Sequence, residues 1–331
     1  MNIYITLDYE LFFGSNSGTV EKCVIEPTQA LLDIVEPYNI KFTCFVDSGY
    51  LLALEKQMEQ FPSLSQDYQK ITKQIRYLAK NGHGIELHIH PHWEDSYFDG
   101  HKWVFNTDRY KLSDFNEKEI FRIVSDYTNV LKRISGKPPI AYRAGGWSAQ
   151  PFASIGKALW ANGIRKDSTV YPQGCYKSHN QSFDFRNIPE YTTGYKFSND
   201  LVTPNIDGDF EEIPISSIKV RPTFFWFFAL KKLKKEPEHL SYGDGTAISM
   251  SKKELFRLMT TSSYSVVSID GYKSKLVAKA FLKYKQKIVN PENFVIIGHP
   301  KAFTAFSLKN LSRFIKSTAR NHNYLTYQWG E

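Results

Sequence analysis

The sequence has few of the features that mark secreted, membrane-spanning or multidomain proteins. It contains only three cysteines in 331 residues, Cys23, Cys44 and Cys175, and their odd number and irregular spacing argue against a disulfide framework. No basic segment followed by an apolar stretch and a cleavage site precedes the apolar residues 2–7, so no signal peptide is predicted. These absences favour a cytoplasmic protein.

Nothing in the sequence divides the chain into parts. It contains no linker rich in proline, glycine or serine and no internal repeat, and its hydrophobic content of 42% is ample for one large core. We therefore predict a single domain over residues 1–331, with insertions near residues 93–114 and 171–250.

Two kinds of apolar pattern alternate along the chain. Short apolar or β-branched runs predict strands at residues 2–7, 41–46, 84–87, 140–142, 163–166, 212–218, 294–298 and 324–328. Apolar residues three and four apart predict helices at residues 27–37, 64–81, 115–133, 150–162, 251–263 and 305–319. Because strands separated by helices form parallel sheets with right-handed connections, we predict an α/β fold.

Three histidines, His88, His90 and His92, follow the predicted strand at residues 84–87. His88 and His92 are four apart, which places two imidazoles on one side of the backbone in a strand end or a helical turn. Two such nitrogens and one carboxylate are enough to hold a catalytic divalent metal ion. The alternative is a solvated polar loop.

Carboxylates end the first predicted strand. Asp8 and Glu10 are two residues apart, so in extended backbone both side chains emerge on one face while Tyr9 points to the other. One carboxylate can bind a metal ion while the other handles protons. Alternatively, Asp8 caps a turn and Glu10 is solvated.

Three further apolar runs end in polar groups. Arg143 follows residues 140–142 and precedes Gly145 and Gly146, Asp167 follows residues 163–166, and His299 follows residues 294–298. In a parallel α/β fold the carboxyl ends of the strands converge on one rim, so these groups are expected to meet in one pocket. Taken singly, they also suit a surface ion pair, a helix cap and a hydrogen-bonded turn residue.

Taken in order, these segments resemble the polysaccharide deacetylase family, also called the NodB homology domain or carbohydrate esterase family 4. The resemblance spans residues 1 to about 300 and is carried by Thr6–Glu10, Gly82–His88 with His92, Arg143–Gly146, Asp167 and Gly298–His299. One departure is Tyr9, since the commoner family pattern begins with two adjacent aspartates. Glu10 fits a variant in which the second acid stands one residue further on.

The resemblance implies a distorted (β/α) barrel with about seven parallel strands. It also implies a metal-dependent hydrolase that removes an N-acetyl or other acyl group, with Glu10, His88 and His92 as metal ligands. Asp8 would accept the proton of the attacking water while paired to Arg143, and His299 would protonate the leaving amine. We expect Asp167 to orient His299 and raise its pKa, because a carboxylate favours the charged imidazole.

The ligand set does not select one metal. Two imidazoles and one carboxylate suit Zn²⁺, which is the default, and also Co²⁺, Ni²⁺ or Fe²⁺. The same set describes the facial triad of iron oxygenases, but those enzymes use an all-β scaffold and this chain alternates strands with helices.

The expected substrate is an amino sugar or glycan intermediate, nucleotide-linked or lipid-linked, because a cytoplasmic enzyme meets biosynthetic intermediates. Aromatic residues in the two insertions suit stacking on sugar rings and equally suit loop packing. Alternatives are hydrolysis of a small or cyclic amide, and a carbohydrate-binding relative without turnover. No RRM, helix-turn-helix or zinc-finger pattern indicates a nucleic-acid partner.

Residues 221–236 combine an aromatic block with four lysines. The block is far too short to span a bilayer, but this composition suits peripheral contact with a membrane surface. The alternative is a core-packing aromatic cluster followed by a solvated basic helix end. The formal net charge of +8 favours anionic partners, such as phospholipid head groups or a diphosphate-linked sugar.

Overall fold

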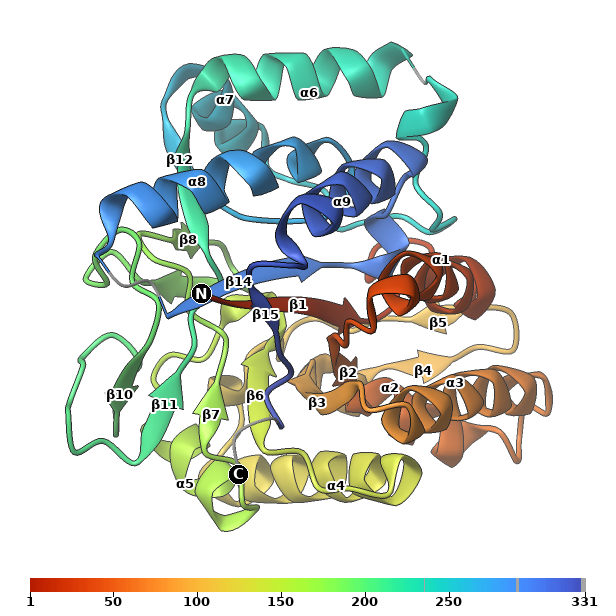
Figure 1. Cartoon of the computed structure of the whole chain (residues 1–331). Helices are drawn as coiled ribbons and strands as arrows, with labels where there is room; N and C mark the ends of the chain where they lie inside the picture. The colour runs from red at the N-terminus through yellow and green to blue at the C-terminus, as the bar shows by residue number, and fades with distance from the viewer. Residues whose placement is uncertain (235, 290–291, 329–331) are drawn as a thin grey trace.

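The computed structural model describes residues 1–234, 236–289 and 292–328. A nine-stranded sheet, curled into a half-barrel, runs through the molecule, and its central path has the strand order β10-β11-β7-β6-β3-β2-β1-β14 (Figure 1). Strand β15 pairs with β1 outside this path. Seven consecutive strands, β11 to β14 in this order, are parallel, and β10 pairs antiparallel with β11. The predicted barrel-like α/β fold is confirmed.

The strands of this sheet are short and mostly buried. In sequence order they are β1 (Asn2–Tyr9), β2 (Thr43–Asp47), β3 (Gly84–Ile89), β6 (Ala141–Ala144), β7 (Lys166–Asp167), β10 (Tyr195–Phe197), β11 (Phe210–Glu212), β14 (Asn293–Gly298) and β15 (Asn323–Tyr324). Strand β1 lies between β2 and β14, and Ile3, Ile5 and Leu7 have no exposed surface. Since both faces of β1 are covered, its apolar run is nearly continuous, as expected for a parallel sheet.

Helices cover the sheet on both sides, with α8 and α9 above it and α4 and α5 below it in Figure 1. The helices are α1 (Glu26–Val35), α2 (Ser48–Gln57), α3 (Ser63–Lys80), α4 (Glu117–Ser135), α5 (Ala153–Ala161), α6 (Pro222–Lys234), α7 (Lys252–Thr260), α8 (Val277–Lys287) and α9 (Ala305–Thr318). Helix α4 shows how local sequence sets these bounds. Asn116 and Glu119 form a capping box at its start, and Gly136, with a φ of 80°, ends it.

The segment predicted as one strand at residues 212–218 is two strands, β11 and β12 (Ser217–Val220). Strand β11 pairs with β7, whereas the Ser216 amide already donates to the carbonyl of Val295 on β14. Pro214 lies between these pairings and has no amide hydrogen to continue a ladder. The chain therefore crosses here from one edge of the half-barrel toward the other. Helices α2, α6 and α8 were not among the predicted elements.

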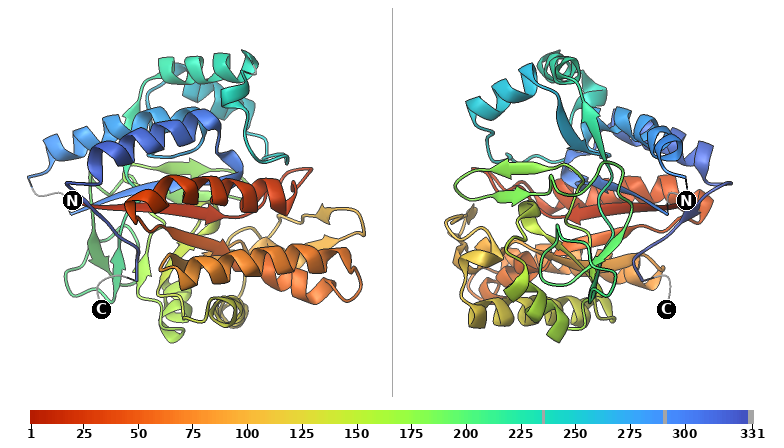
Figure 2. Two further views of the ribbon diagram at one scale, coloured as in Figure 1. Left: turned by 45° about the vertical axis from the view of Figure 1, so that its right-hand side comes forward. Right: turned by 90° about the vertical axis from the view of Figure 1, so that its left-hand side faces the viewer.

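Smaller hairpins surround the sheet. The 93–114 segment contains the pair β4 (Tyr97–Phe98) and β5 (Trp103–Val104), and the 171–250 segment contains β8 (Cys175–Lys177) with β9 (Ser182–Asp184). Strand β12 pairs with β13 (Ser263–Val266) below α6 and α7, as the two turned views show (Figure 2). None of the described helices combines the length and the apolar character needed to cross a bilayer. The single-domain organisation stays a prediction.

Candidate active site

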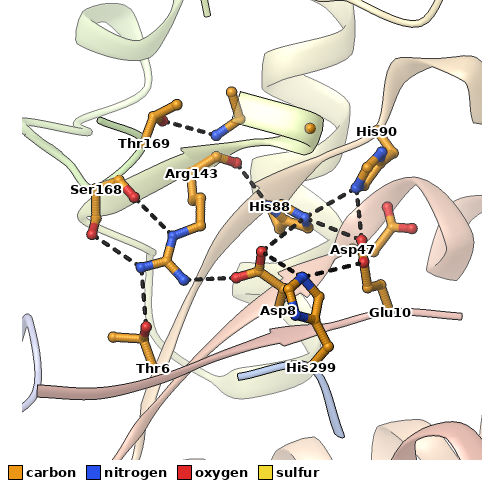
Figure 3. Close-up of polar contacts among 12 residues, drawn as sticks. Thr6, Asp8, Glu10, Asp47, His88, His90, Arg143, Ser168, Thr169 and His299 are labelled. Atoms are coloured by element: carbon orange, nitrogen blue, oxygen red, sulfur yellow. Dashed lines mark hydrogen bonds and ion pairs between the residues drawn. The ribbon is translucent and has the colours of Figure 1, made fainter. Parts of the chain in front are cut away.

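The polar groups predicted at the strand ends lie together at the carboxyl-terminal rim of the sheet (Figure 3). Asp8 and Glu10 come from the end of β1, His88 from β3, Arg143 from β6 and His299 from the residue after β14. Parallel pairing of these strands puts their ends side by side, although the residues are up to 291 positions apart in the sequence.

A carboxylate and two imidazoles form a compact cluster at this rim. The Nε2 atom of His90 lies 2.7 Å from Oε2 of Glu10, and Nε2 of His88 lies 3.3 Å from the same oxygen. The two Nε2 atoms are 3.1 Å apart, and all three residues are buried. Ligand atoms about 2.0–2.1 Å from a tetrahedral zinc ion lie about 3.3 Å from one another. These three atoms could therefore hold a metal ion together.

A hydrogen bond at Nδ1, on the other side of the His88 ring, supports metal binding by Nε2. Nδ1 of His88 lies 2.9 Å from the carbonyl oxygen of Arg143. A carbonyl only accepts, so Nδ1 carries the proton, and Nε2 can present its lone pair to a metal ion. Burial alone would lower the pKa of His88, but the carboxylates of Asp8 and Glu10 raise it. Without a metal ion, the charges of these two carboxylates therefore help to hold the His88 ring in place.

The expected ligand His92 lies outside this cluster, and His90 takes its place. Strand β3 continues to Ile89, so His88 and His90 project to the same face with the strand period of two. The chain then turns at Pro91 into a short 3₁₀ helix, Pro91–Asp95, and the turn carries His92 away. The assignment of His92 therefore needs correction, because it assumed a spacing of four.

His92 is instead packed among aromatic rings. Its ring stacks on Tyr110 at a centroid distance of 5.5 Å and on Trp93 at 5.6 Å, and the edge of Phe13 lies 4.6 Å away. Burial lowers the pKa of His92 well below its usual value, and His90 lowers it further. Within the described part of the chain, neither ring nitrogen has a hydrogen-bond partner. The neutral ring acts here as a packing group beside the cluster.

Glu10 has a second partner that the sequence did not suggest. The Lys301 ammonium group donates to Oε1 of Glu10 at 2.9 Å and also to the carbonyl of Leu11, and Lys301 is only 8% exposed. Burial alone would raise the pKa of Glu10, but Lys301 and His90 hold it well below its usual value. Glu10 is therefore ionised, as a metal-binding carboxylate must be.

Arg143 holds Asp8 in place. Its Nη1 atom donates to Oδ1 of Asp8 at 2.6 Å, and Nε donates to the carbonyl of Ser168 at 2.8 Å. The Nη2 atom donates to the hydroxyls of Thr6 and Ser168, and the guanidinium carbon lies 4.1 Å from the centre of the Phe45 ring. This arrangement leaves Oδ2 of Asp8 facing the site, 3.9 Å from Nε2 of His88 and 3.6 Å from Nε2 of His299.

His299 is oriented by Asp270 and not by the predicted Asp167. Oδ2 of Asp270 lies 2.8 Å from Nδ1 of His299, and Oδ1 accepts the backbone amide of the same histidine at 2.7 Å. Burial alone would lower the pKa of His299, but the Asp270 carboxylate, with Asp8 and Glu10, raises it to about 9. His299 is therefore protonated at neutral pH, and its Nε2–H points into the site.

Asp167 holds the backbone at the rim in place through hydrogen bonds. It accepts the backbone amide of Thr169 at 2.7 Å and its hydroxyl at 3.2 Å, and that hydroxyl accepts the amide of Ala144 at 3.0 Å. Burial raises the pKa of Asp167 and raises that of its neighbour Glu212 well above the usual range. The expected partnership of Asp167 with His299 was wrong because both oxygens of Asp167 bond to Thr169, just after β7.

Asp47 at the rim was missed, and the contact of Gly145 with His90 was not foreseen. Asp47, at the end of β2, accepts the indole N–H of Trp93 at 2.6 Å, and burial raises its pKa to about 7. Gly145 packs so closely on His90 that an added Cβ would lie 2.5 Å from Nδ1 of that ring. The position needs glycine because the backbone supports the imidazole directly.

A large cavity adjoins this cluster. It has a volume of about 1380 Å³ and is bordered by loops and by the β8–β9 hairpin. Its wall includes Phe13 and Tyr110, whose rings lie 4.5 and 5.6 Å from that of His90. Trp147, Tyr171 and Tyr176 also line it, among many polar groups. The residues around His90 therefore form part of a pocket wide enough for several sugar rings.

Comparison with known proteins bears on the fold. No protein-family model matches the sequence, and no curated protein matches it either. A structure described as a probable polysaccharide deacetylase from Pseudomonas aeruginosa PAO1 has 11% identity and a TM-score of 0.50, covering 98% of this chain and 87% of that one.

Two further solved structures are similar. The Puue allantoinase structure has 11% identity and a TM-score of 0.50, covering 99% of this chain and 87% of that one. A family 4 carbohydrate esterase from Streptomyces lividans, in complex with acetate, has 11% identity and a TM-score of 0.37, covering 96% of this chain and 89% of that one. The two structures with a TM-score of 0.50 show that this chain has the NodB-like fold of the polysaccharide deacetylases.

Proposed function

We propose that this protein is a metal-dependent hydrolase that removes an N-acyl group from an amino sugar. The observation that carries the proposal is the convergence of two histidines and a carboxylate, spaced for a metal ion, with a buried Asp–Arg pair and a protonated histidine. Each part suits one requirement of amide hydrolysis, which needs an activated water, a base and an acid.

Glu10, His88 and His90 would hold the divalent metal ion, with Zn²⁺ as the best fit to two nitrogens and one oxygen and Co²⁺, Ni²⁺ and Fe²⁺ as alternatives. When bound, such an ion lowers the pKa of a coordinated water and polarises a carbonyl oxygen. Asp8 lies next to His88, and its free oxygen is within reach of a ligand at the same centre.

Asp8 and His299 are suited to opposite proton transfers. Arg143 pairs with Oδ1 of Asp8, so the other carboxylate oxygen is left free to accept a proton from water. The pairing with Asp270 stabilises the protonated form of His299, so its Nε2–H can donate to the leaving amine. The two groups are 3.6 Å apart, which lets both reach one scissile amide.

The cavity favours a glycan over a compact amide. A volume of about 1380 Å³ exceeds the usual 300–1,000 Å³ of small-molecule sites, and the aromatic rings that line it suit the apolar faces of sugars. Hydrolysis of a cyclic amide is the second candidate, because the Puue allantoinase structure shares the fold. All three cysteines are free, which supports the proposal of a cytoplasmic site of action.

Acetate release from N-acetylated amino sugars, measured with and without a chelator, tests the proposal. We expect release that is lost with chelator and restored by Zn²⁺ or Co²⁺, and lost in the Asp8→Asn variant. Activity on cyclic amides alone would favour the second candidate. Metal binding without turnover of either class would support a carbohydrate-binding protein and contradict the proposed hydrolase.

A further inference from the structure

The large apolar side chains that the fold leaves exposed gather in one part of the molecule. Of sixteen such side chains in the described residues, nine lie between positions 226 and 256. They are Trp226, Phe227, Leu230 and Leu233 on α6, Leu240, Ile248 and Met250 in the following loop, and Leu255 and Phe256 on α7. Scattered apolar residues are normal on a surface, whereas a cluster of this kind marks an interaction site.

Helix α6 is apolar on both of its faces. Its inner face packs on the domain, because Phe225 is buried and the rings of Phe224 and Phe228 lie 5.3 and 6.2 Å from that of Tyr272. Its outer face carries Trp226, Leu230 and Leu233, at positions i, i+4 and i+7, with Phe227 beside them. A helix on a free surface normally presents polar residues outward, whereas the apolar side chains of this face are at least half exposed, although the indole N–H of Trp226 donates to the carbonyl of Met259 at 3.0 Å.

The same region carries most of the excess positive charge. Residues 219–260 contain nine Lys and Arg against four Asp and Glu, a balance of +5 out of the +8 of the whole chain. Arg221, Lys234, Lys252 and Lys253 are exposed, and Lys231 pairs with Glu236 at 2.7 Å. Apolar and basic side chains thus occupy one projecting part of the molecule, where α6 forms the outermost layer (Figures 1 and 2).

We propose that α6 and α7 form a docking surface for an anionic phospholipid bilayer. An exposed apolar helix with adjacent lysines is the composition of helices that lie in the membrane interface, where the apolar side chains enter the acyl boundary and the basic ones meet phosphate groups. With 13 residues, α6 is about 20 Å long, which is too short to cross the bilayer but sufficient to lie on it.

Charge favours a bilayer over a second copy of this chain. A two-fold dimer through α6 would bring the same patch of both subunits together, and two surfaces of balance +5 would repel each other. A bilayer that contains anionic lipids instead neutralises these charges, and it takes up apolar side chains without needing a complementary shape.

The surface is directly connected to the cavity. Glu254, Arg257 and Leu258 of α7 line the cavity, whereas Leu255 and Phe256 of the same helix are exposed. The lysines and arginines that line the cavity outnumber its single carboxylate, Glu254; they are Lys102, Arg186, Arg257 and Lys273. If the proposed hydrolase function is right, the docked enzyme would meet amino sugars carried on anionic lipids.

Co-sedimentation with vesicles tests the docking surface without any assay of activity. The full chain is mixed with two kinds of vesicle. One kind contains phosphatidylcholine alone, and the other contains roughly 30–40% phosphatidylglycerol as well, which makes its surface strongly negative. We expect binding to the anionic vesicles, and at least about tenfold weaker binding for Phe227→Ser/Leu233→Ser. Lys234→Gln should weaken binding about fivefold and should make its loss with salt less steep.

Leu282→Ser is the matched control, because Leu282 is 57% exposed on the lysine-rich helix α8. It should bind as the unchanged protein does, and circular dichroism should show that all variants are folded. No binding to anionic vesicles, or equal losses in the control and in Phe227→Ser/Leu233→Ser, would overturn the proposal. Self-association that this double variant abolishes, without vesicle binding, would assign the surface to a second copy. Turnover of soluble substrates is a separate measurement, so either proposal can fail alone.

Discussion

Replacing Asp270 by asparagine should move the proton of His299. The pKa of His299 is about 9, compared with an ordinary value of 6.5, and the Asp270 carboxylate is the largest cause that raises it. This rise corresponds to a preference for the protonated ring of about 3 kcal/mol, at 1.36 kcal/mol for each pKa unit. An opposite charge at this distance contributes about one to three pKa units, so Asp270→Asn should lower the pKa of His299 to about 7.

The consequence is largest in mildly alkaline solution. At pH 8 the protonated fraction of His299 should fall from roughly nine-tenths to roughly one-tenth, since the pKa moves from above to below this pH. Titration of the His299 ring by NMR in the metal-free protein measures the shift directly. If His299 is the acid, the alkaline limb of kcat/KM should move to lower pH in the same variant.

Asp167→Asn is the control for this experiment. Asparagine resembles the protonated carboxyl that the raised pKa of Asp167 favours, and Asp167 contacts Thr169 and not His299. The titration of His299 should therefore be nearly unchanged. A shift in the Asp167 variant together with none in the Asp270 variant would refute the assignment of Asp270 as the partner of His299.

Three other outcomes are expected. Gly145→Ala should weaken metal binding by about 10–100-fold, because the added Cβ would displace His90. Gly194→Ala is the control and should bind metal as the unchanged protein does, because no atom lies nearer than 3.5 Å to its added Cβ. Isothermal titration with Zn²⁺ compares the two variants. Arg143→Met should lower the free energy of unfolding by about 3–5 kcal/mol in urea, because Asp8 is left buried without its partner; a loss below about 1 kcal/mol would contradict this. The contribution of the Asp270–His299 pair to the stability of the folded protein should be complete below pH 6.5, where the histidine of the unfolded chain is also protonated. It should fade as the pH rises through about 9. The difference in Tm between the metal-free protein and Asp270→Asn should shrink over that range, and a constant difference would show that charge does not cause it.

The sequence was most informative where buried strands end. Apolar runs that stop at Asp8, His88, Arg143 and His299 are local patterns, and parallel pairing brings their ends together by a general rule. The confirmed fold followed from the same alternation of strands and helices, together with the family resemblance. The predictions of the strand ends and of the fold depend on the periodicity of apolar residues, which can be read from a single sequence.

The errors concern residues whose position depends on one turn or on distant packing. The choice between His90 and His92 depended on whether β3 continues past His88, and the sequence showed Pro91 but not the last paired residue. Asp167 and Asp270 both follow short apolar runs, and only the three-dimensional arrangement shows which one contacts His299. Lys301 lies in the short helix after β14 rather than at the strand end itself, so the strand pattern did not link it to Glu10.

Metal binding by single-histidine variants tests the central claim most directly. Co²⁺ titrations, followed by visible absorption and by metal analysis after dialysis, compare the unchanged protein with His88→Ala, His90→Ala and His92→Ala. We predict one ion per chain in the unchanged protein, loss of binding in the first two variants, and retained binding in His92→Ala. Retained binding in His90→Ala together with loss in His92→Ala would contradict the site formed by Glu10, His88 and His90.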